Sequence, residues 1–405
     1  MPVFLPFRAL RPSKEKISHF SAKTSDFKNL EEVLTNMQTN MESYYHVTKQ
    51  QLFLSGKKSV EHYFKIGAEF VKQKVSEVVL IRDKVPCFYV YRQIDHRTGR
   101  SFTGIIGLVD VLDLESNKIK KHELTKVVRE EYLYKQLHFT QVLGEPVLMG
   151  YPHSGSVEKI IANALENVPE YDFKTIDNKE HLVWLINNSF DLELIQDHFA
   201  EMPAFYIADG HHRCASTIRN YERNPEPINR YFMVHLLDEN QFHIESFHRL
   251  LSGLTQEDTS NLEEKLAEYF EVEDYNKDEL FVPQRHSQFG ILTREYSFKL
   301  TLVKDTKSTN PEAHLDVSLL ESRFFKPIMG IVHPRTDHRL SYISSLENIN
   351  HIKELLNNKD IDMIISNYPI SFDEVKQIAD ANKTMPPKST YIEPKLRGGM
   401  IIQQF

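Results

Sequence analysis

Cysteine is scarce in this sequence: only Cys87 and Cys214 occur in 405 residues, and neither belongs to a Cys-x-x-Cys pair. A disulfide framework needs several cysteines, and a zinc site made of thiolates needs ligands at short, regular spacing. The two distant cysteines therefore argue against both kinds of site. They are typical of a protein that works in a reducing compartment.

A long hydrophobic run is also missing. No stretch approaches the roughly 18 uninterrupted apolar residues that a membrane-spanning helix needs. Residues 1–8 contain no basic segment followed by an apolar run, which a secretory signal would show. These absences predict a cytoplasmic protein without a membrane partner.

The chain has no excess of positive charge. Its 57 acidic and 49 basic side chains give a formal net charge of -8. Because a general nucleic-acid binder carries a basic excess over its binding face, this balance argues against nucleic acid as the partner. With 40% hydrophobic and 26% charged residues, the composition is that of a globular protein and argues against disorder.

The length and the order of the expected elements indicate two lobes. A chain of 405 residues exceeds what one hydrophobic core usually serves. Strands and helices alternate up to about residue 250, and beyond it a charged helix is followed by a stretch of period two. We predict an α/β or mixed α+β fold with lobes at 1–250 and 251–405, and we expect the tail 385–398 to return to the site of the first lobe. The sequence does not indicate an oligomeric state.

Apolar spacing gives the individual elements. The expected helices are 58–76, 156–167, 190–201, 256–270, 315–325, 347–358 and 371–382. The expected strands are 87–91, 104–111, 145–151, 181–186, 205–208, 231–237, 296–302 and 362–365, with a hairpin turn at 96–99 between the first two. Trp184 is expected in the core rather than as a stacking surface.

The strongest chemical signal is the segment Asp209-Gly210-His211-His212-Arg213, between an expected strand and an expected helix. The first N–H groups of a helix lack intrahelical partners and attract anions. Gly210 allows close backbone approach, and Arg213 can hold a phosphate through two parallel N–H bonds. Asp209 can cap the helix or bind a divalent cation that accompanies a nucleotide. The segment predicts a polyphosphate site; the alternative is a capping aspartate with histidines satisfied in a turn.

Two weaker segments complete the set of candidates. In Lys120-Lys121-His122-Glu123-Leu124-Thr125, Glu123 can act as a base toward a hydroxyl group while its neighbours supply charge, although an exposed turn has the same composition. In 385–391, two prolines stiffen a loop that presents Lys388, Ser389 and Thr390, although a rigid connector would look the same. The charged segment 333–339 suits anion binding or a surface salt-bridge cluster, and we assign it no catalytic role.

Five motifs in order resemble a widespread family of unknown function with IADGHHR and MPPKST sequences, and the resemblance covers essentially the whole chain. They are found at 6–12, 120–125, 207–213, 334–337 and 385–390. Three of them also resemble, more distantly, the free serine kinase SerK of the ParB/sulfiredoxin superfamily. That resemblance implies a ParB/sulfiredoxin-like nucleotide-binding core with inserted elements, and a smaller C-terminal α+β lobe.

The same resemblance implies roles for individual residues. Glu123 would be the catalytic base with His122 beside it, and Lys388, Ser389 and Thr390 would bind the substrate. The phosphates of ATP or ADP would be bound by Asp209, Gly210, His211, His212 and Arg213, with Asp209 also a ligand of Mg²⁺.

The function implied is that of a small-molecule kinase, with a nucleotide and a small hydroxylated metabolite such as free serine as partners. Where the kinase has Arg-His after its Thr-Thr, this chain has Tyr391-Ile392. The resemblance therefore does not decide whether the acceptor is as small as serine. The alternative is a ParB-like nucleotide-binding or nucleotide-hydrolysing switch without small-molecule transfer. An interaction protein with a decayed site is the third possibility.

Overall fold

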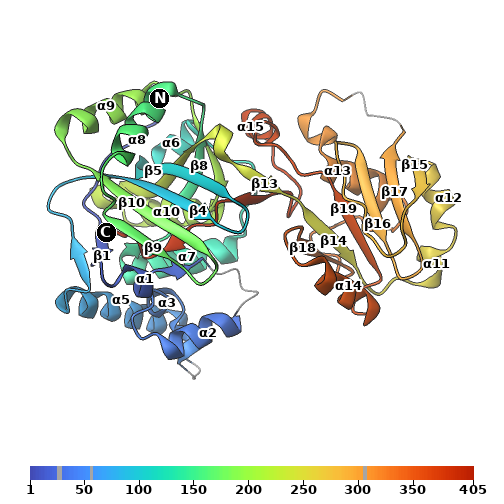
Figure 1. Cartoon of the computed structure of the whole chain (residues 1–405), viewed down its shortest axis with the longest axis horizontal. Helices are drawn as coiled ribbons and strands as arrows, with labels where there is room; N and C mark the ends of the chain where they lie inside the picture. Colours follow the sequence, from blue (N-terminus) through green and yellow to red (C-terminus); the bar gives the residue numbers. More distant parts are fainter. Residues whose placement is uncertain (25–29, 55–57, 304–307) are drawn as a thin grey trace. The chain divides into compact units, whose positions relative to one another are not determined.

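The computed structural model forms two compact units of mixed α/β structure, which confirms the expected fold class (Figure 1). It describes residues 1–24, 30–54, 58–303 and 308–405. Unit 1 comprises Met1–Phe242 and Pro394–Phe405, and unit 2 comprises His243–Glu393. The chain thus enters the second unit after residue 242, against an expected boundary near 250. The segment that returns to the first unit is Pro394–Phe405, against an expected 385–398.

An eight-stranded sheet forms the centre of unit 1. Across the sheet the strands are β6 (Ile119–Lys120), β11 (Phe205–Asp209), β8 (Val147–Tyr151), β12 (Tyr231–Asp238), β5 (Arg100–Asp110), β4 (Phe88–Asp95), β10 (Lys179–Ile186) and β9 (Tyr171–Lys174). Two neighbouring pairs are parallel, β6 with β11 and β8 with β12. Because β11 runs antiparallel to β8, the carboxyl ends of these two pairs lie at opposite ends of the strands.

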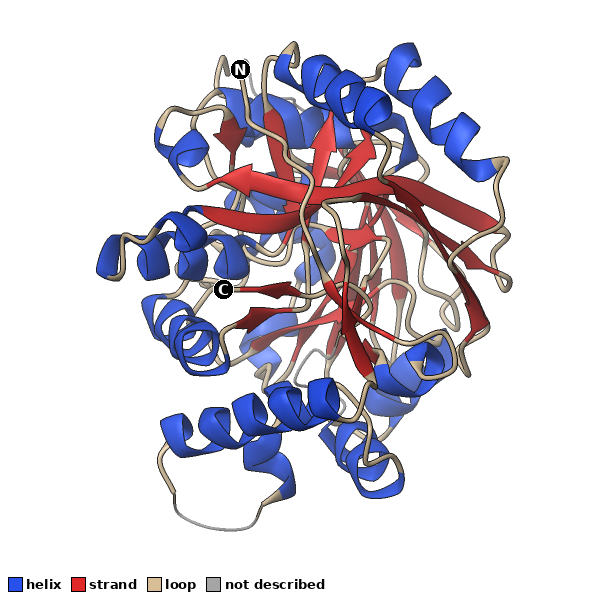
Figure 2. Cartoon of the chain, turned by 90° about the vertical axis from the view of Figure 1, so that its left-hand side faces the viewer, coloured by secondary structure: helices blue, strands red, loops and turns tan. Residues whose placement is uncertain are grey.

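One face of this sheet carries the main apolar core. Alternate residues of β12, namely Phe232, Val234 and Leu236, are buried there with side chains of α8 (Gly155–Leu165), α9 (Ser189–Ala200) and α10 (His211–Arg223). Trp184 belongs to the same core and its Nε1 donates to Asn167 O at 2.8 Å, as expected of a packed tryptophan. Figure 2 shows helices on both sides of the strands of this unit.

Unit 1 also contains further helices and two-stranded pairs outside this sheet. The helices are α1 (Ile17–Phe20), α2 (Leu30–Thr39), α3 (Tyr45–Thr48), α4 (Gln50–Phe53), α5 (Val60–Ser76), α6 (Leu112–Glu115) and α7 (Val127–Thr140). The two-stranded pairs are β1 (Leu10–Pro12) with β3 (Leu80–Arg82), β2 (Ala22–Lys23) with β21 (Arg397–Gly398), and β7 (Val142–Leu143) with β22 (Gln403–Gln404). The last two pairs attach the C-terminal segment to unit 1.

Unit 2 is built on a six-stranded antiparallel sheet. Across it the strands are β15 (Phe270–Asp274), β17 (Ser297–Leu302), β16 (Gln288–Leu292), β19 (Met363–Asn367), β14 (Phe247–Leu251) and β18 (Leu340–Ser344). Its helices are α11 (Gln256–Thr259), α12 (Leu262–Ala267), α13 (Asp316–Leu320), α14 (Ile349–Asn357) and α15 (Phe372–Asp380). The pair β13 (His243–Glu245) and β20 (Tyr391–Glu393) stands where the chain enters and leaves the unit.

Most expected elements are found within a few residues of their predicted bounds, and two differ informatively. The helix expected at 256–270 is interrupted, because Asn261 takes a left-handed φ of 52° and starts α12 as its N-cap. Helix α10 begins at His211, whereas the sequence predicted its start after Arg213. His211 and His212 therefore lie inside its first turn. Among the described residues, no helix combines the length and hydropathy needed to cross a bilayer.

A buried polar network holds the N-terminal segment on unit 1. Arg11 Nε donates to Asp83 Oδ1 at 2.8 Å, and the Tyr89 hydroxyl donates to Asp83 Oδ2 at 2.7 Å. The backbone N–H of Ala9 donates in turn to the Tyr89 hydroxyl at 3.0 Å. Asp83 is therefore the acceptor shared by a half-buried arginine and a fully buried tyrosine.

Replacing Asp83 with alanine should lower the free energy of unfolding of unit 1. Breaking a buried ion pair from one side costs about 3–5 kcal/mol, and we expect about 2–4 kcal/mol because part of Arg11 can still reach water. Urea unfolding followed by Trp184 fluorescence measures the change. Asp172→Ala, which removes an exposed aspartate of β9, is the control, and equal midpoints for the two variants would contradict this role of Asp83.

Candidate functional site

A glycine makes the turn from β11 into α10. Gly210 is the N-cap residue of the helix and has a φ of 101°, in the left-handed region that L side chains avoid. A Cβ atom at this position would lie 2.9 Å from Arg213 Nη2. Gly210 thus permits both the abrupt change from strand to helix and the packing of Arg213 across the turn.

Asp209 is held between two cations and does not cap α10. Its Oδ2 accepts from Arg213 Nη2 at 3.0 Å, and its Oδ1 lies 3.3 Å from Lys395 Nζ. No side chain of the described residues caps the helix at Gly210, so the capping role considered from the sequence is not found. Arg213 Nη1 also donates to Pro146 O at 2.6 Å, which fixes the guanidinium against the start of β8.

Arg213 and Lys395 form a clamp around Asp209 and determine the charge of its carboxyl group. Burial acts to raise the pKa of its carboxyl group, but Lys395 and Arg213 outweigh burial and lower that pKa to about 2. The carboxylate is therefore ionised at neutral pH. Since 42% of its side chain stays exposed, an ion or ligand from solvent can still reach it.

The parallel pairing of β6 with β11 brings His122 against His211. The two rings meet edge to face, with their centroids 4.5 Å apart. The backbone N–H of His122 points to His211 Nε2 at 3.5 Å, which makes Nε2 the acceptor and leaves the ring proton on Nδ1. Burial lowers the pKa of His122 to about 4, and burial together with His122 lowers the pKa of His211 well below its usual value. Both rings are neutral at physiological pH.

Glu123 lies next to this pair. Its Oε2 is 3.7 Å from His211 Nδ1, and half of its side chain is exposed. The segment 120–125 is therefore not a plain solvated turn, because His122 is 2% exposed while Glu123 faces outward beside the first turn of α10. The structure brings together the first two of the three predicted site segments.

Helix α7 holds α10 in place. Arg219 donates to Glu130 at 2.6 Å and to Glu131 at 2.9 Å, and Arg223 forms a second ion pair with Glu131 at 2.9 Å. His212 lies on this side of α10, where burial and the charge of Arg129 lower the pKa of its ring. These ion pairs fix the rotation of α10 and thereby the positions of its first-turn residues.

Residues 121–123 and 209–213 meet where β6 and β11 end, and we call this region the corner. Two ring nitrogens at the corner lack partners. Nδ1 of His122 and Nδ1 of His212 are buried and make no hydrogen bond within the described part of the chain. Buried polar atoms are nearly always satisfied by protein, water or a ligand. The corner therefore retains unused hydrogen-bonding capacity next to its charged groups.

The third predicted segment belongs to unit 2. Lys388 takes a φ of 55° and its Nζ lies 5.1 Å from the centre of the Phe247 ring. Ser389 is buried and its hydroxyl donates to Pro386 O at 2.7 Å, which closes the loop on itself. Residues 385–387 line a cavity of about 390 Å³ together with Glu312, Glu321, Val332, His333, Pro334, Arg335, Thr336 and Thr384. The segment is thus a stiff loop at the wall of a charged cavity.

The sequence reasoning did not single out Lys395. This residue follows the proline-stiffened loop and reaches Asp209 because the returning segment pairs with β2 and β7. The only signal for it was the expectation that the tail 385–398 returns to the first lobe. The carbonyl of Pro146 carries no signal at all, since any residue supplies that group.

The sequence model of the family described as "Protein of unknown function (DUF1015)" matches residues 4–318. No curated protein matches the chain. Among solved structures, a mutant free serine kinase in complex with AMP is similar with a TM-score of 0.38 and 13% identity, over 73% of this chain and 90% of that one.

Two further solved structures are similar over 73% of this chain. A C-terminally truncated SbnI from Staphylococcus aureus has a TM-score of 0.39 and 14% identity, over 85% of its own chain. A conserved hypothetical protein from Pyrococcus furiosus has a TM-score of 0.36 and 13% identity, over 94% of its own chain. All three likenesses are distant.

The neutral His122 gives unit 1 a stability that depends on pH. An unfolded imidazole binds a proton near pH 6.5, whereas folded His122 does so only near pH 4, so the unfolded state binds more protons in between. The contribution of neutral His122 to the free energy of unfolding is therefore complete above pH 6.5 and is lost as the pH falls toward 4. One such group accounts for about 2 kcal/mol between pH 7.5 and pH 5.

Urea midpoints of the Trp184 signal at these two pH values test the role of His122. His122→Gln should reduce the loss of stability on acidification by about 2 kcal/mol, since other buried histidines still contribute. His62→Gln, at an exposed position of α5, should leave the loss unchanged. A His122→Gln variant with the wild-type pH dependence would show that this ring is not held neutral.

Proposed function

This chain belongs to the DUF1015 family of proteins of unknown function, and we propose that it is a small-molecule kinase that transfers a phosphoryl group from ATP or ADP to a hydroxyl acceptor such as free serine. The position of Glu123 carries the proposal. A half-exposed carboxylate stands 3.7 Å from His211 Nδ1, at the end of a helix that is suited to bind a phosphate group. A base next to a phosphate cradle is what phosphorylation of a hydroxyl group requires.

The start of α10 supplies the phosphate cradle. The first N–H groups of this 13-residue helix point toward Gly210, and the helix dipole places positive charge there. Lys395 and Arg213 add two full positive charges beside Asp209, and Lys121 is close enough to lower the pKa of His211. Cations thus outnumber the carboxylates of Asp209 and Glu123 at this corner, which favours a polyanion.

Asp209 fits the binding of a nucleotide-associated Mg²⁺ ion. Mg²⁺ is usually bound by one or two carboxylates together with phosphate oxygens. Asp209 is ionised, fixed by two cations and 42% exposed, so it can supply one such ligand. When bound, the ion would neutralise charge on the transferring phosphoryl group.

In the proposed reaction Glu123 takes the proton of the acceptor hydroxyl group. The acceptor oxygen forms a bond to the terminal phosphorus, and the bond between that phosphorus and its bridging oxygen breaks. The nucleotide leaves with one phosphate fewer, and Glu123 is left protonated. Neutral His211 presents an N–H toward the carboxylate and acts as a positioning residue that keeps Glu123 facing the helix end.

The acceptor contacts stay a prediction. We propose Lys388 and Thr390 for these contacts, since the Ser389 hydroxyl is already donated to Pro386. Free serine is the first acceptor to test, followed by larger hydroxylated metabolites, because Tyr391-Ile392 replaces the Arg-His of the similar kinase.

Glu123→Gln should abolish phosphoryl transfer while nucleotide binding persists. Loss of a general base costs about 10²–10⁴-fold in rate, and the amide keeps the size of the side chain. Transfer from radiolabelled ATP and ADP to serine and other hydroxylated metabolites measures the activity, with Glu115→Gln in α6 as the matched control. Full activity of Glu123→Gln would exclude this mechanism. Binding with slow hydrolysis in the wild type, whatever the acceptor, would identify a nucleotide switch.

Lys395→Met should weaken nucleotide binding, because it removes one of the two cations that hold Asp209. A charge-assisted contact of this kind is worth about 1.5–3 kcal/mol, or roughly 10- to 100-fold in affinity. Calorimetric titration with Mg-ADP and Mg-ATP measures the change. Lys174→Met, at an exposed position of β9, should bind as the wild type does. Unchanged affinity of Lys395→Met would place the nucleotide elsewhere.

A further inference from the structure

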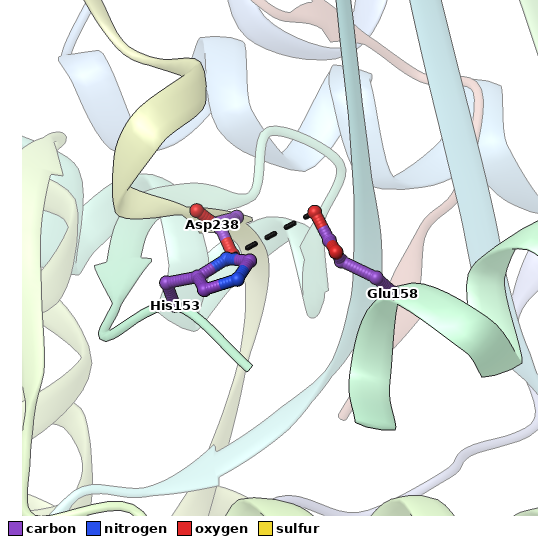
Figure 3. Close-up of side chains that lie close together, drawn as sticks. All are labelled: His153, Glu158 and Asp238. Carbon is purple, nitrogen blue, oxygen red and sulfur yellow. Dashed lines mark hydrogen bonds and ion pairs between the residues drawn. The ribbon is translucent and has the colours of Figure 1, made fainter. Parts of the chain in front are cut away.

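A second group of chemically reactive side chains lies at the opposite end of the strands. Strands β8 and β12 run parallel, and their last paired residues are Tyr151 and Asp238. His153 follows β8 two residues later, and Glu158 lies in the first turn of α8. The carboxyl ends of neighbouring parallel strands are where open α/β sheets bind ligands. Figure 3 shows the three side chains of His153, Glu158 and Asp238 turned toward one another.

The distances between these side chains suit a single ion. His153 Nδ1 is 2.8 Å from Asp238 Oδ2 and 3.9 Å from Glu158 Oε1, and all three ligand atoms lie within 4.8 Å of one another. Two ligand atoms that each stand about 2.1 Å from one ion are at most about 4.2 Å apart. Since the Glu158 side chain is exposed and free to rotate, a small adjustment brings all three atoms into range.

Two of the three side chains are already oriented. Asp238 is 2% exposed at its side chain, and its Oδ1 accepts from the backbone N–H of Asn240 at 2.9 Å, which leaves Oδ2 directed at His153. The backbone N–H of His153 donates to Glu239 Oε1 at 3.2 Å. Hydrogen bonds of this kind, made by residues that do not touch the ion, orient metal ligands before the ion binds.

A buried hydroxyl group beside the cluster has no partner. Tyr151 is 0% exposed, and its hydroxyl makes no hydrogen bond within the described part of the chain. Tyr151 is the strand partner of Asp238 in the parallel pair of β8 and β12, so its ring lies beside this carboxylate. A bound ion with its water ligands would satisfy such an isolated polar group.

We propose that His153, Glu158 and Asp238 bind a divalent transition-metal ion, with Zn²⁺ as the best match. One imidazole nitrogen and two carboxylate oxygens form a ligand set that zinc accepts, and three protein ligands leave a coordination position for water or substrate. Mg²⁺ prefers oxygen ligands alone and retains most of its water. The proton now shared between His153 and Asp238 leaves to solvent as the ion takes its place.

This site is distinct from the corner at Asp209. The two clusters stand at opposite ends of the strands, because β11 is antiparallel to β8 and β12. The simpler interpretation is that Asp238 pairs only with His153, and that Glu158 occupies the first turn of α8 because an acid is favoured there. That interpretation predicts no stoichiometric metal binding, so titration separates the two.

Titration of the full chain, freed of metal by chelator dialysis, tests the proposal. We expect one Zn²⁺ ion per chain to bind at micromolar concentration by calorimetry, and Co²⁺ to produce visible d–d absorption at the same stoichiometry. His153→Ala and Glu158→Gln should each weaken Zn²⁺ binding by at least about tenfold. Both positions are exposed, so circular dichroism should show an unchanged fold.

Two controls keep the result interpretable. Glu166→Gln alters an exposed acid at the other end of α8, and His212→Ala alters a histidine outside the cluster; neither variant should change the affinity. Absence of Zn²⁺ binding by the wild-type chain would overturn the proposal. So would affinity that survives in His153→Ala and Glu158→Gln, or that falls in His212→Ala instead.

Discussion

The parallel pairing of β6 with β11 is the constraint on which the candidate site depends. It sets Lys120 beside Tyr206, so the residues that follow β6 meet those that follow β11. His122 is thereby buried against His211, and Glu123 is left facing outward at the helix end. Because burial keeps both rings neutral, they add no charge of their own to the charged groups beside them.

The same topology explains why charged and ionisable side chains cluster at two places in unit 1. The sheet is largely antiparallel, and only β6–β11 and β8–β12 among its described strands pair in parallel. Each parallel pair ends in loops on the same side, where polar side chains can converge without being paired across a hairpin. Asp209 and Glu123 end one pair, and Asp238 and His153 end the other.

Local patterns in the sequence predicted much of the fold and two of the segments that meet at the candidate site. The spacing of apolar residues and the turn-forming residues located strands such as 205–208 and the hairpin at 96–99, since these elements depend on neighbours in sequence. Long-range partners left no such signal. Lys395 reaches Asp209 from a distant segment, and His153 meets Asp238 only through strand order. The interruption at Asn261 was missed because a left-handed residue inside a charged helical pattern is invisible to periodicity.

The clamp on Asp209 bears on how a nucleotide would enter. An isolated buried carboxylate would repel phosphate, and isolated buried cations would be costly to desolvate. Here Lys395 and Arg213 are already paired with Asp209, so these charges have partners within the protein itself. In the proposed reaction, a polyphosphate that arrives with its own divalent cation would allow an exchange of partners, in which the carboxylate would turn to the cation and Lys395 to the phosphate. Charges that are already ordered would change partners in this exchange, and little new charge would have to be desolvated.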